Sequence, residues 1–329
     1  MAPLQVTSEL ASNSGHPHSR FSTHIPWLGF VVSKPVDSIL LVTNVRAGTA
    51  DSKSLGAAVA VLEPSATVDV CVTSHPGELD EVLDRLGSRR LVVAGGDGSL
   101  HGVVAALSRR NELKQTVLGL IPVGTGNDFA RGAGIPLDPE EAARLVLNGR
   151  IGPIDLVMDE AGNIVVNNVR VGLGAEASRE ARRWKDRLGR PGYAVGALFA
   201  TFRPLDLRLR VEVDTEVVAD GDRPVLDISI GNGATVGGGV PVNPGADPES
   251  GQMDVIVSLA TGAMARLGYG IDLLRSRHLA RRDVVHRRGN AVSISGTPFY
   301  FSSDGEVSGP VNSRIWRVEQ SAFEMTLPG

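Results

Sequence analysis

The sequence contains a single cysteine, Cys71, among 329 residues, and it lacks a long uninterrupted apolar run. One cysteine excludes a disulfide framework within the chain and favours a reducing compartment, so we expect a cytoplasmic protein. No run reaches the roughly 18 apolar residues that a membrane-spanning helix needs. The first residues also lack a basic start followed by an apolar stretch, so we expect no secretory signal.

Neither sign of charge dominates the sequence. There are 33 Lys and Arg residues against 37 Asp and Glu residues, a net charge of −4. This balance excludes a generic nucleic-acid binder, and no groove-reading or aromatic-interleaved basic element is present, so we expect no nucleic-acid partner. The length suffices for two domains, because single cores rarely grow beyond about 250 residues.

The pattern of apolar residues changes near residue 150. From residue 36 to 150, short apolar strands alternate with helical stretches, which predicts an α/β domain with a doubly wound parallel sheet. Residues 151–329 consist mostly of alternating strand patterns, which predicts a β-rich second domain; a return of the last residues to the first domain stays open. Residues 1–35 are rich in Ser and Thr and poor in charge, so we expect a disordered extension.

In the second part, the alternation predicts a small number of continuous strands and helices. The strands include Ile164–Val171, Leu207–Val218 and Arg314–Val318, and the helices are Ala175–Leu188, Gly192–Thr201 and Ala263–Leu274.

The strongest local signal is Gly95-Gly96-Asp97-Gly98-Ser99, between a predicted strand and a predicted helix. Glycines let backbone N–H groups approach an anion, and the helix N-terminus adds partial positive charge. The loop therefore predicts a phosphate site, with a tight structural turn as the alternative. Asp97 would repel phosphate unless a cation lies between them, so it indicates Mg²⁺. The loop matches neither the Walker A nor the dinucleotide-binding pattern.

A second glycine-rich loop, Gly124-Thr125-Gly126-Asn127-Asp128, follows the predicted strand Val117–Pro122. Loops at the carboxyl ends of parallel strands line the ligand crevice of an open sheet. We therefore expect this loop to lie beside the first one. Two such loops favour ligand binding over a purely structural turn.

Together the two loops resemble the paired signature of the diacylglycerol kinase catalytic family, which soluble bacterial lipid kinases and sphingosine kinases share. The first loop is also similar to that of NAD kinases and, more distantly, of phosphofructokinases. The similarity extends along the chain from about residue 38, and includes Asn168–Ala175, Gly231–Gly233, Gly237–Gly239 and Ser303-Asp304-Gly305-Glu306. The resemblance implies an NAD kinase-like α/β domain followed by a β-sandwich-like domain.

The resemblance also implies an activity: transfer of the γ-phosphate of ATP, with Mg²⁺, to a lipid hydroxyl, first of all that of diacylglycerol to give phosphatidic acid. It implies Asp304 as the general base, with Asp97 and Asp128 as further catalytic carboxylates. Phosphoryl transfer does need a group that accepts the proton of the attacking alcohol. The nucleotide-binding residues that the resemblance implies are Asn44, Thr73, Gly95, Gly96, Asp97, Gly98, Ser99, Leu100, His101, Gly124, Thr125, Gly126, Asn127 and Glu306.

The chain departs from the family's pattern after Asn44, where Val45 replaces the usual proline, and in two further places. Where the family commonly has Thr followed by Asn-Glu two residues later, this chain has Ser99 and then His101-Gly102, which would weaken nucleotide contacts. The family's structural Mg²⁺ is held by one carboxylate and two backbone carbonyls. The matching positions are Ser250 for the carboxylate and Asp247 and Gln252 for the carbonyls. Because a hydroxyl is a weaker ligand for a hard cation, either Glu249 substitutes or the site is lost.

Two basic clusters predict reversible contact with an anionic membrane surface. Residues 179–190 hold six basic residues against two acidic ones around Trp184, and residues 275–288 hold six arginines against Asp283. Each basic residue near an anionic leaflet contributes roughly 1 kcal/mol. A solvated face or a subunit contact is the alternative, and a homodimer is the usual oligomer.

Two other functions stay open. One is an NAD kinase-like enzyme with a small-molecule acceptor, against which the second loop and Asp304 argue. The other is a catalytically inactive regulator that binds nucleotide or lipid, which only the departures from the family pattern support. The sequence does not select the lipid acceptor.

Overall fold

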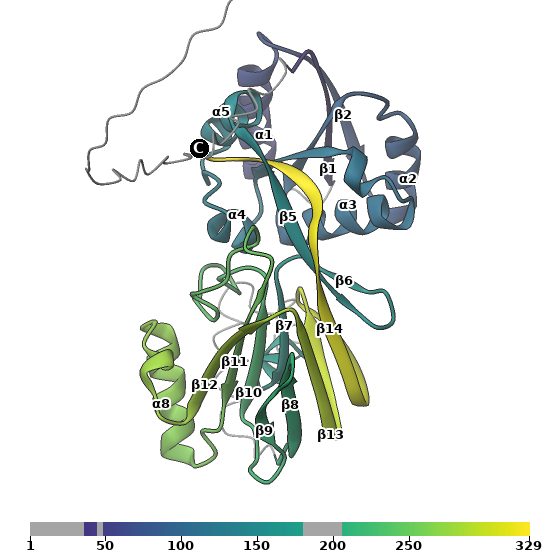
Figure 1. Cartoon of the computed structure of the whole chain (residues 1–329). Coiled ribbons are helices and arrows are strands. Elements are labelled where there is room, and N and C mark those ends of the chain that lie inside the picture. The colour runs from purple at the N-terminus through teal and green to yellow at the C-terminus, as the bar shows by residue number, and fades with distance from the viewer. Residues whose placement is uncertain (1–35, 45–48, 180–205) are drawn as a thin grey trace, which may run out of the picture. The chain divides into compact units, whose positions relative to one another are not determined.

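The computed structural model describes residues 36–44, 49–179 and 206–329 (Figure 1). The predicted extension at residues 1–35 lies outside the described residues, as does the predicted helix Gly192–Thr201. The same holds for most of the predicted helix Ala175–Leu188 and of the first basic cluster. Within the described part, no helix is long and apolar enough to cross a membrane.

The first part of the chain alternates strands with helices, as its apolar pattern predicts. Its elements are β1 (Ser38–Asn44), α1 (Thr49–Leu62), β2 (Thr67–Thr73), α2 (Pro76–Asp84), β3 (Arg90–Gly95), α3 (Asp97–Arg109), a 3₁₀ helix (Leu113–Gln115), β4 (Val117–Pro122), α4 (Asp128–Gly132) and α5 (Pro139–Asn148). The four strands pair in parallel in the order β2-β1-β3-β4. Helix α1 packs against α5, and α2 against α3, on opposite faces of this sheet (Figure 1).

The second part is built mostly from antiparallel strands. Its elements are β5 (Arg150–Asp159), β6 (Ile164–Val165), β7 (Asn168–Gly172), β8 (Leu209–Val213), β9 (Glu216–Asp220), β10 (Asp227–Gly231), β11 (Met253–Ser258), α8 (Ala263–Leu274), a 3₁₀ helix (His278–Ala280), β12 (Val284–Gly289), β13 (Ala291–Ser303) and β14 (Glu306–Leu327). Strand β14 pairs antiparallel with β13 and β5, and its last residues pair in parallel with β4. The last strand of the chain therefore joins both parts.

Each part has its own apolar core. In the α/β part, side chains such as Leu40, Leu91 and Leu100 are fully buried between the sheet and the helices. In the β-rich part, Val169, Ile230 and Trp316 belong to a separate buried cluster. The predicted fold class, a parallel α/β domain followed by a β-rich one, is confirmed.

Three strand predictions are wrong in detail. The segment expected as one strand at Ile164–Val171 is divided into β6 and β7, and the one expected at Leu207–Val218 is the hairpin β8–β9. That hairpin turns at Asp214, which takes a φ of 52°. The strand expected at Arg314–Val318 is the middle of a strand of 22 residues.

Candidate functional site

The two glycine-rich loops lie side by side at the carboxyl ends of β3 and β4. Gly95 and Pro122 are paired in register, and the Val123 N–H donates to the Gly95 carbonyl over 3.3 Å. Gly96 is the N-cap of α3. The N-terminus of α3 thus opens at the same sheet edge as the second loop.

Close packing of the two loops requires glycine at Gly96 and Gly124. A Cβ atom on Gly124 would lie 2.5 Å from the Cα atom of Gly96 and 2.9 Å from Oδ1 of Asn127. Real Cβ contacts are never that short, and the first of these neighbours is backbone. The glycines therefore bring the two loop backbones into direct contact.

Asp97 connects the first loop to the helix that follows the second. Its Oδ1 accepts a hydrogen bond of 2.8 Å from the Phe129 N–H, at the N-terminus of α4. Burial raises the pKa of the Asp97 carboxyl, the backbone N–H groups oppose this effect, and the negative charge of Asp128 raises the pKa further. A cation at this place would relieve the repulsion between the two carboxylates.

Asp128 connects the second loop to the glycine-rich segment Gly237–Gly239. The Gly238 N–H donates to both of its carboxylate oxygens, at 3.1 and 2.9 Å, and the Gly239 N–H donates to Oδ1 at 2.8 Å. The carboxylates of Asp97 and Asp128 converge beside Gly126, since a Cβ atom there would be 3.1 and 3.2 Å from one oxygen of each. They are the acidic groups at this edge that could share a Mg²⁺ arriving with a nucleotide.

Other predicted nucleotide-binding residues surround the same sheet edge. Thr73 ends β2, and its hydroxyl donates to the carbonyl of Thr43 over 3.2 Å, while Asn44 ends β1. Asn127 takes a left-handed φ of 52° and donates to the Gly124 carbonyl over 2.8 Å. Its Oδ1 is buried and, among the described residues, has no hydrogen-bond partner. That oxygen is an acceptor available to a bound ligand.

Asp304 lies in the turn between β13 and β14, with a φ of 47°. Its Oδ1 accepts from the backbone N–H groups of Asn167 and Asn168, at 2.9 and 3.0 Å, and its Oδ2 accepts from that of Val166 at 2.8 Å. The side chain is only 5% exposed. Three backbone donors therefore fix the carboxylate in place.

His101 is the fourth partner of that carboxylate. It lies one turn into α3 from the phosphate loop, and its Nδ1 is 2.8 Å from Oδ2 of Asp304. The hydrogen bond that the imidazole makes to Asp304 raises the pKa of His101, burial opposes this, and the charges of Asp304 and Glu306 add to the increase. The imidazole is 28% exposed, so it is the accessible member of the pair.

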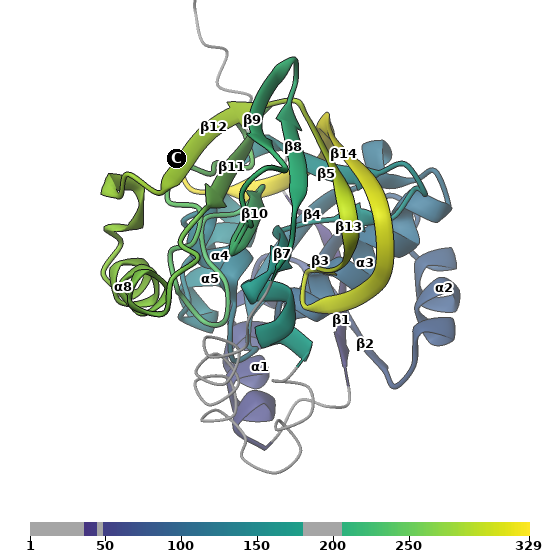
Figure 2. The same cartoon turned by 90° about the horizontal axis from the view of Figure 1, so that it is seen from below.

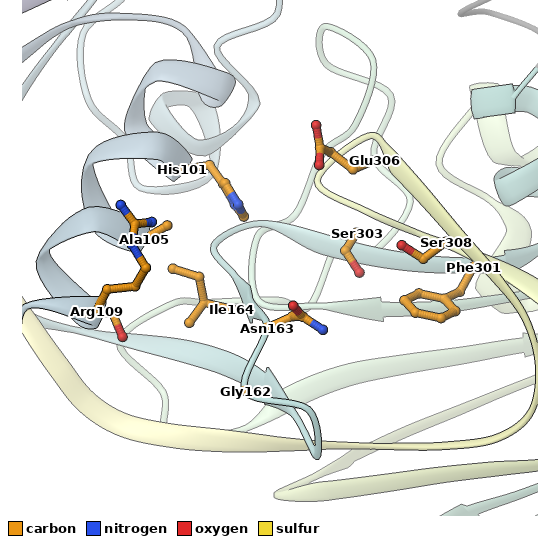
Figure 3. Close-up of a pocket in the computed structure, with 11 residues that line it drawn as sticks. His101, Ala105, Arg109, Gly162, Asn163, Ile164, Phe301, Ser303, Glu306 and Ser308 are labelled. Atoms are coloured by element: carbon orange, nitrogen blue, oxygen red, sulfur yellow. The ribbon is translucent and has the colours of Figure 1, made fainter. Parts of the chain in front are cut away.

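His101 faces a pocket of about 270 Å³. Figure 3 shows the imidazole projecting from α3 toward this space, with Glu306 across from it and Arg109 further along the same helix. The remaining lining residues come from α3, from β6 and the turn before it, and from β13 and β14: Ala105, Ser108, Gly162, Asn163, Ile164, Phe301, Ser303 and Ser308. The pocket thus lies between α3 and the turn that holds Asp304, and His101 is its lining residue nearest in sequence to the phosphate loop.

The predicted metal residues form a hydrogen-bonded turn elsewhere. The Ser250 hydroxyl lies 2.7 Å from the carbonyl oxygen of Asp247 and 3.2 Å from that of Gln252. Both carboxylate oxygens of Glu249 accept from Arg150, at 2.6 and 2.7 Å. Within the described residues, no group of three or more acidic, His or Cys side chains is arranged to hold a metal. The hydroxyl bridges the carbonyls, and Glu249 is held by Arg150, so these residues do not fit Mg²⁺.

Ser250→Asp is expected to create a Mg²⁺-dependent gain in stability that the natural chain lacks, because it supplies a carboxylate beside two carbonyl oxygens. A ligand that binds only the folded state at 100 times its Kd adds about 2.7 kcal/mol. Thermal unfolding without nucleotide, in Mg²⁺ or in EDTA, measures the gain, and Ser250→Asn is the uncharged control. An equal Mg²⁺ response of the natural chain would contradict the expectation.

The structure brings together the two loops, His101, Asp304 and Glu306. The Asp247–Gln252 turn instead contacts β5 and β14, through Asp155 and Gln320. The sequence did not reveal the backbone donors at Val166, Asn167 and Asn168 that hold Asp304. Nor did it reveal Arg109 as a pocket residue. Backbone donors have no residue signature, and they lie 136 to 138 positions from Asp304 along the chain.

Comparison with protein families gives two adjoining matches. Residues 38–158 match the diacylglycerol kinase catalytic domain. Residues 167–326 match the YegS C-terminal NAD kinase beta sandwich-like domain. The two matches include both glycine-rich loops, His101 and Asp304.

Individual proteins are similar over most of the chain. A protein of Stenotrophomonas maltophilia named "Probable lipid kinase YegS-like" is 32% identical over 269 residues, which cover 77% of this chain and 83% of that protein. A protein of Cronobacter sakazakii with the same name is 34% identical over 223 residues, covering 65% and 72%. Among solved structures, a diacylglycerol kinase of Bacillus anthracis superposes with a TM-score of 0.71 at 23% identity, covering 90% of this chain and 98% of that one. This last likeness concerns the fold alone.

Proposed function

The chain belongs to the YegS-like lipid kinase family, and from this premise we propose that it transfers the γ-phosphate of ATP to a lipid hydroxyl. The acceptor that we propose is diacylglycerol, which would become phosphatidic acid. The observation that carries the proposal is the His101–Asp304 pair, which lies within one helical turn of the phosphate loop. A phosphate-binding loop and a proton acceptor are the two parts that such a transfer needs.

The first loop is suited to hold the phosphates of the nucleotide. Its backbone N–H groups and the N-terminus of α3 attract an anion, and the glycines at 96 and 124 let the two loop backbones pack directly against each other. Asp97 and Asp128 would hold Mg²⁺. When bound, Mg²⁺ neutralises charge on the phosphates. Asn44, Thr73 and Asn127 lie at the same edge, where they would contact the nucleotide.

The arrangement around Asp304 refines its predicted role as general base. A carboxylate has about four acceptor positions, and three backbone N–H groups and His101 already occupy those of Asp304. The proton acceptor is therefore the imidazole Nε2, and Asp304 is a positioning residue that orients the ring and stabilises its charged form. This division of roles is that of His and Asp in serine proteases.

The transfer then balances as follows. The lipid hydroxyl oxygen forms a bond to the γ-phosphorus while the bond from that phosphorus to the β–γ bridging oxygen breaks. ADP leaves with the bridging oxygen and its electron pair. The hydroxyl proton moves to Nε2 of His101, and solvent takes it once the product has left.

The experiment measures transfer of labelled γ-phosphate from ATP and Mg²⁺ to a panel of lipids in mixed micelles, with NAD in a parallel reaction. We expect label in diacylglycerol and none in NAD. Label in NAD alone would replace this function with that of an NAD kinase. Nucleotide binding without label in any acceptor would favour an inactive regulator.

A further inference from the structure

Helix α8 carries a row of apolar side chains on its solvent-facing side. Met264, Leu267, Ile271 and Leu274 are 79%, 45%, 41% and 71% exposed. Their spacing of three, four and three residues places them on one face of the helix. We name these four residues the α8 stripe. Figure 2 shows α8 at the outer side of the β-rich part, next to β12 and away from β13 and β14.

The stripe is not the face that fixes the helix to the protein. On the opposite side Tyr269 is buried in a small apolar cluster with Leu226 and Ala260, and Ala265 and Leu273 pack against that cluster. The Tyr269 hydroxyl donates to Oδ2 of Asp227 over 3.1 Å. The helix is thus apolar on both sides, and only the inner side has partners within the described residues.

Exposed arginines lie at the C-terminal end of the stripe. Arg275, Arg277 and Arg282 are exposed, and none of them has a carboxylate partner in the described part of the chain. Arg281, by contrast, is neutralised by ion pairs of 2.8 Å with Asp272 and Asp283. The end of α8 therefore combines apolar side chains with positive charge that the protein leaves uncompensated.

This combination fits a lipid surface better than a second copy of the chain. A stable protein interface takes about 20 to 30 residues on each side, whereas the stripe offers four on a helix about 18 Å long. An amphipathic helix that lies in a membrane interface needs only an apolar face and basic residues near it. Anionic headgroups supply the negatively charged partners that these arginines lack among the described residues.

We propose that the α8 stripe enters the headgroup region of an anionic membrane while Arg275, Arg277 and Arg282 bind its headgroups, so that the protein docks reversibly where its acceptor resides. The nature of that acceptor rests on the proposed function, but the docking itself does not. The arginines belong to the second basic cluster of the sequence, and the structure adds the apolar partner that the sequence did not reveal.

Sedimentation of the full chain with vesicles tests the docking. Vesicles of phosphatidylglycerol and phosphatidylcholine are compared with vesicles of phosphatidylcholine alone. Leu267→Gln with Ile271→Gln is expected to lower the partition coefficient at least about 10-fold, because two apolar side chains leave the interface. Arg275→Gln with Arg277→Gln should lower it by roughly 5-fold per arginine, and only with the anionic vesicles.

The matched control is Val72→Gln with Val217→Gln, which changes two exposed apolar residues on strands β2 and β9 and should leave the partition unchanged. Partition of the Leu267 and Ile271 double variant equal to that of the natural chain would overturn the proposal. The proposal would also be overturned if light scattering showed that the natural chain is a dimer and that this variant is a monomer which still binds vesicles. Phosphorylation of a short-chain, water-soluble acceptor should be equal in the natural chain and all variants. If none of these proteins phosphorylates the acceptor, but vesicle binding still depends on the α8 stripe, the proposed function is wrong and the docking proposal stands.

Discussion

Asp304→Asn is expected to lower kcat about 10³- to 10⁴-fold while nucleotide affinity is unchanged. The amide nitrogen of the substituted side chain must replace either Oδ2, which contacts the Val166 N–H and Nδ1 of His101, or Oδ1, which accepts from the N–H groups of Asn167 and Asn168. If it faces the imidazole, the ring takes the opposite tautomer and Nε2 carries a proton. The corresponding change in a serine protease costs about 10⁴ in kcat. Steady-state phosphate transfer to diacylglycerol measures kcat, and titration with nucleotide measures the nucleotide affinity.

Asp214→Asn is the matched control for this variant. Asp214 also lies in a hairpin turn with a positive φ, and its carboxylate accepts from the backbone N–H groups of Asn290 and Ala291 at 3.0 and 2.9 Å. It lines no part of the pocket. In Asp304→Asn the amide nitrogen must face a backbone donor, which costs about 1–3 kcal/mol of stability, because both carboxylate oxygens accept from backbone N–H groups. Asp214→Asn can keep both of its bonds through the amide oxygen, and it should keep full activity. An unchanged kcat for Asp304→Asn would exclude Asp304 from the reaction.

The order of strands and helices in the α/β part could be predicted because each element carries its own pattern. Strand β1 is almost wholly buried, so its residues form one apolar run. Helix α5 begins where Asp138 caps the N–H groups of Glu140 and Glu141 at 3.0 Å. The placement of both glycine loops at one edge then follows from the parallel sheet, since successive carboxyl ends meet there. The strands, the helix start and the loop positions each depend on residues that are close together in the sequence, so the sequence pattern predicts them.

The division between β6 and β7 could not be predicted because it serves a distant residue. The segment Ile164–Val171 alternates like one strand, but the N–H groups of Val166 and Asn167 turn away to bind the carboxylate of Asp304. A backbone donor is the same in every residue but proline. The pattern of side chains therefore predicted a strand here, but it carried no sign of the backbone donors that bind Asp304.

The predicted roles of Asp97 and Asp128 show a similar limit. The sequence indicated Mg²⁺ from Asp97 and a catalytic carboxylate at Asp128, and one oxygen of each lies close to Gly126. Each also holds a backbone segment, Asp97 that of Phe129 and Asp128 that of Gly238 and Gly239. Sequence alone does not distinguish a carboxylate that binds a ligand from one that accepts hydrogen bonds from the backbone.

His101→Asn is expected to lower kcat about 10²- to 10³-fold and to remove the acid limb of the pH profile. The asparagine amide can still donate to Asp304, but it cannot accept a proton, and general base catalysis contributes about 10² to 10⁴. In the natural chain the ring must be neutral to act. Since hydrogen bonding to Asp304 raises the pKa of His101, kcat should fall as the pH drops through a value above 6.5, the ordinary pKa of histidine. Three other charged groups belong to this setting: Glu306 and Arg109 line the same pocket, and Asp97 lies one turn earlier on α3.

The pH dependence of stability should run in the opposite direction, which separates catalysis from folding. Because the pKa of His101 is raised in the folded state, its contribution to stability is fully present below the unfolded value of about 6.5 and is lost as the pH rises through the folded one. The natural chain thus gains activity over the pH range in which this contribution to stability disappears. Steady-state kinetics and thermal unfolding of the natural chain and of His101→Asn, measured across that pH range, test the two opposite trends. If His101→Asn keeps both the rate and the acid limb of the natural chain, the proton goes to a group other than His101.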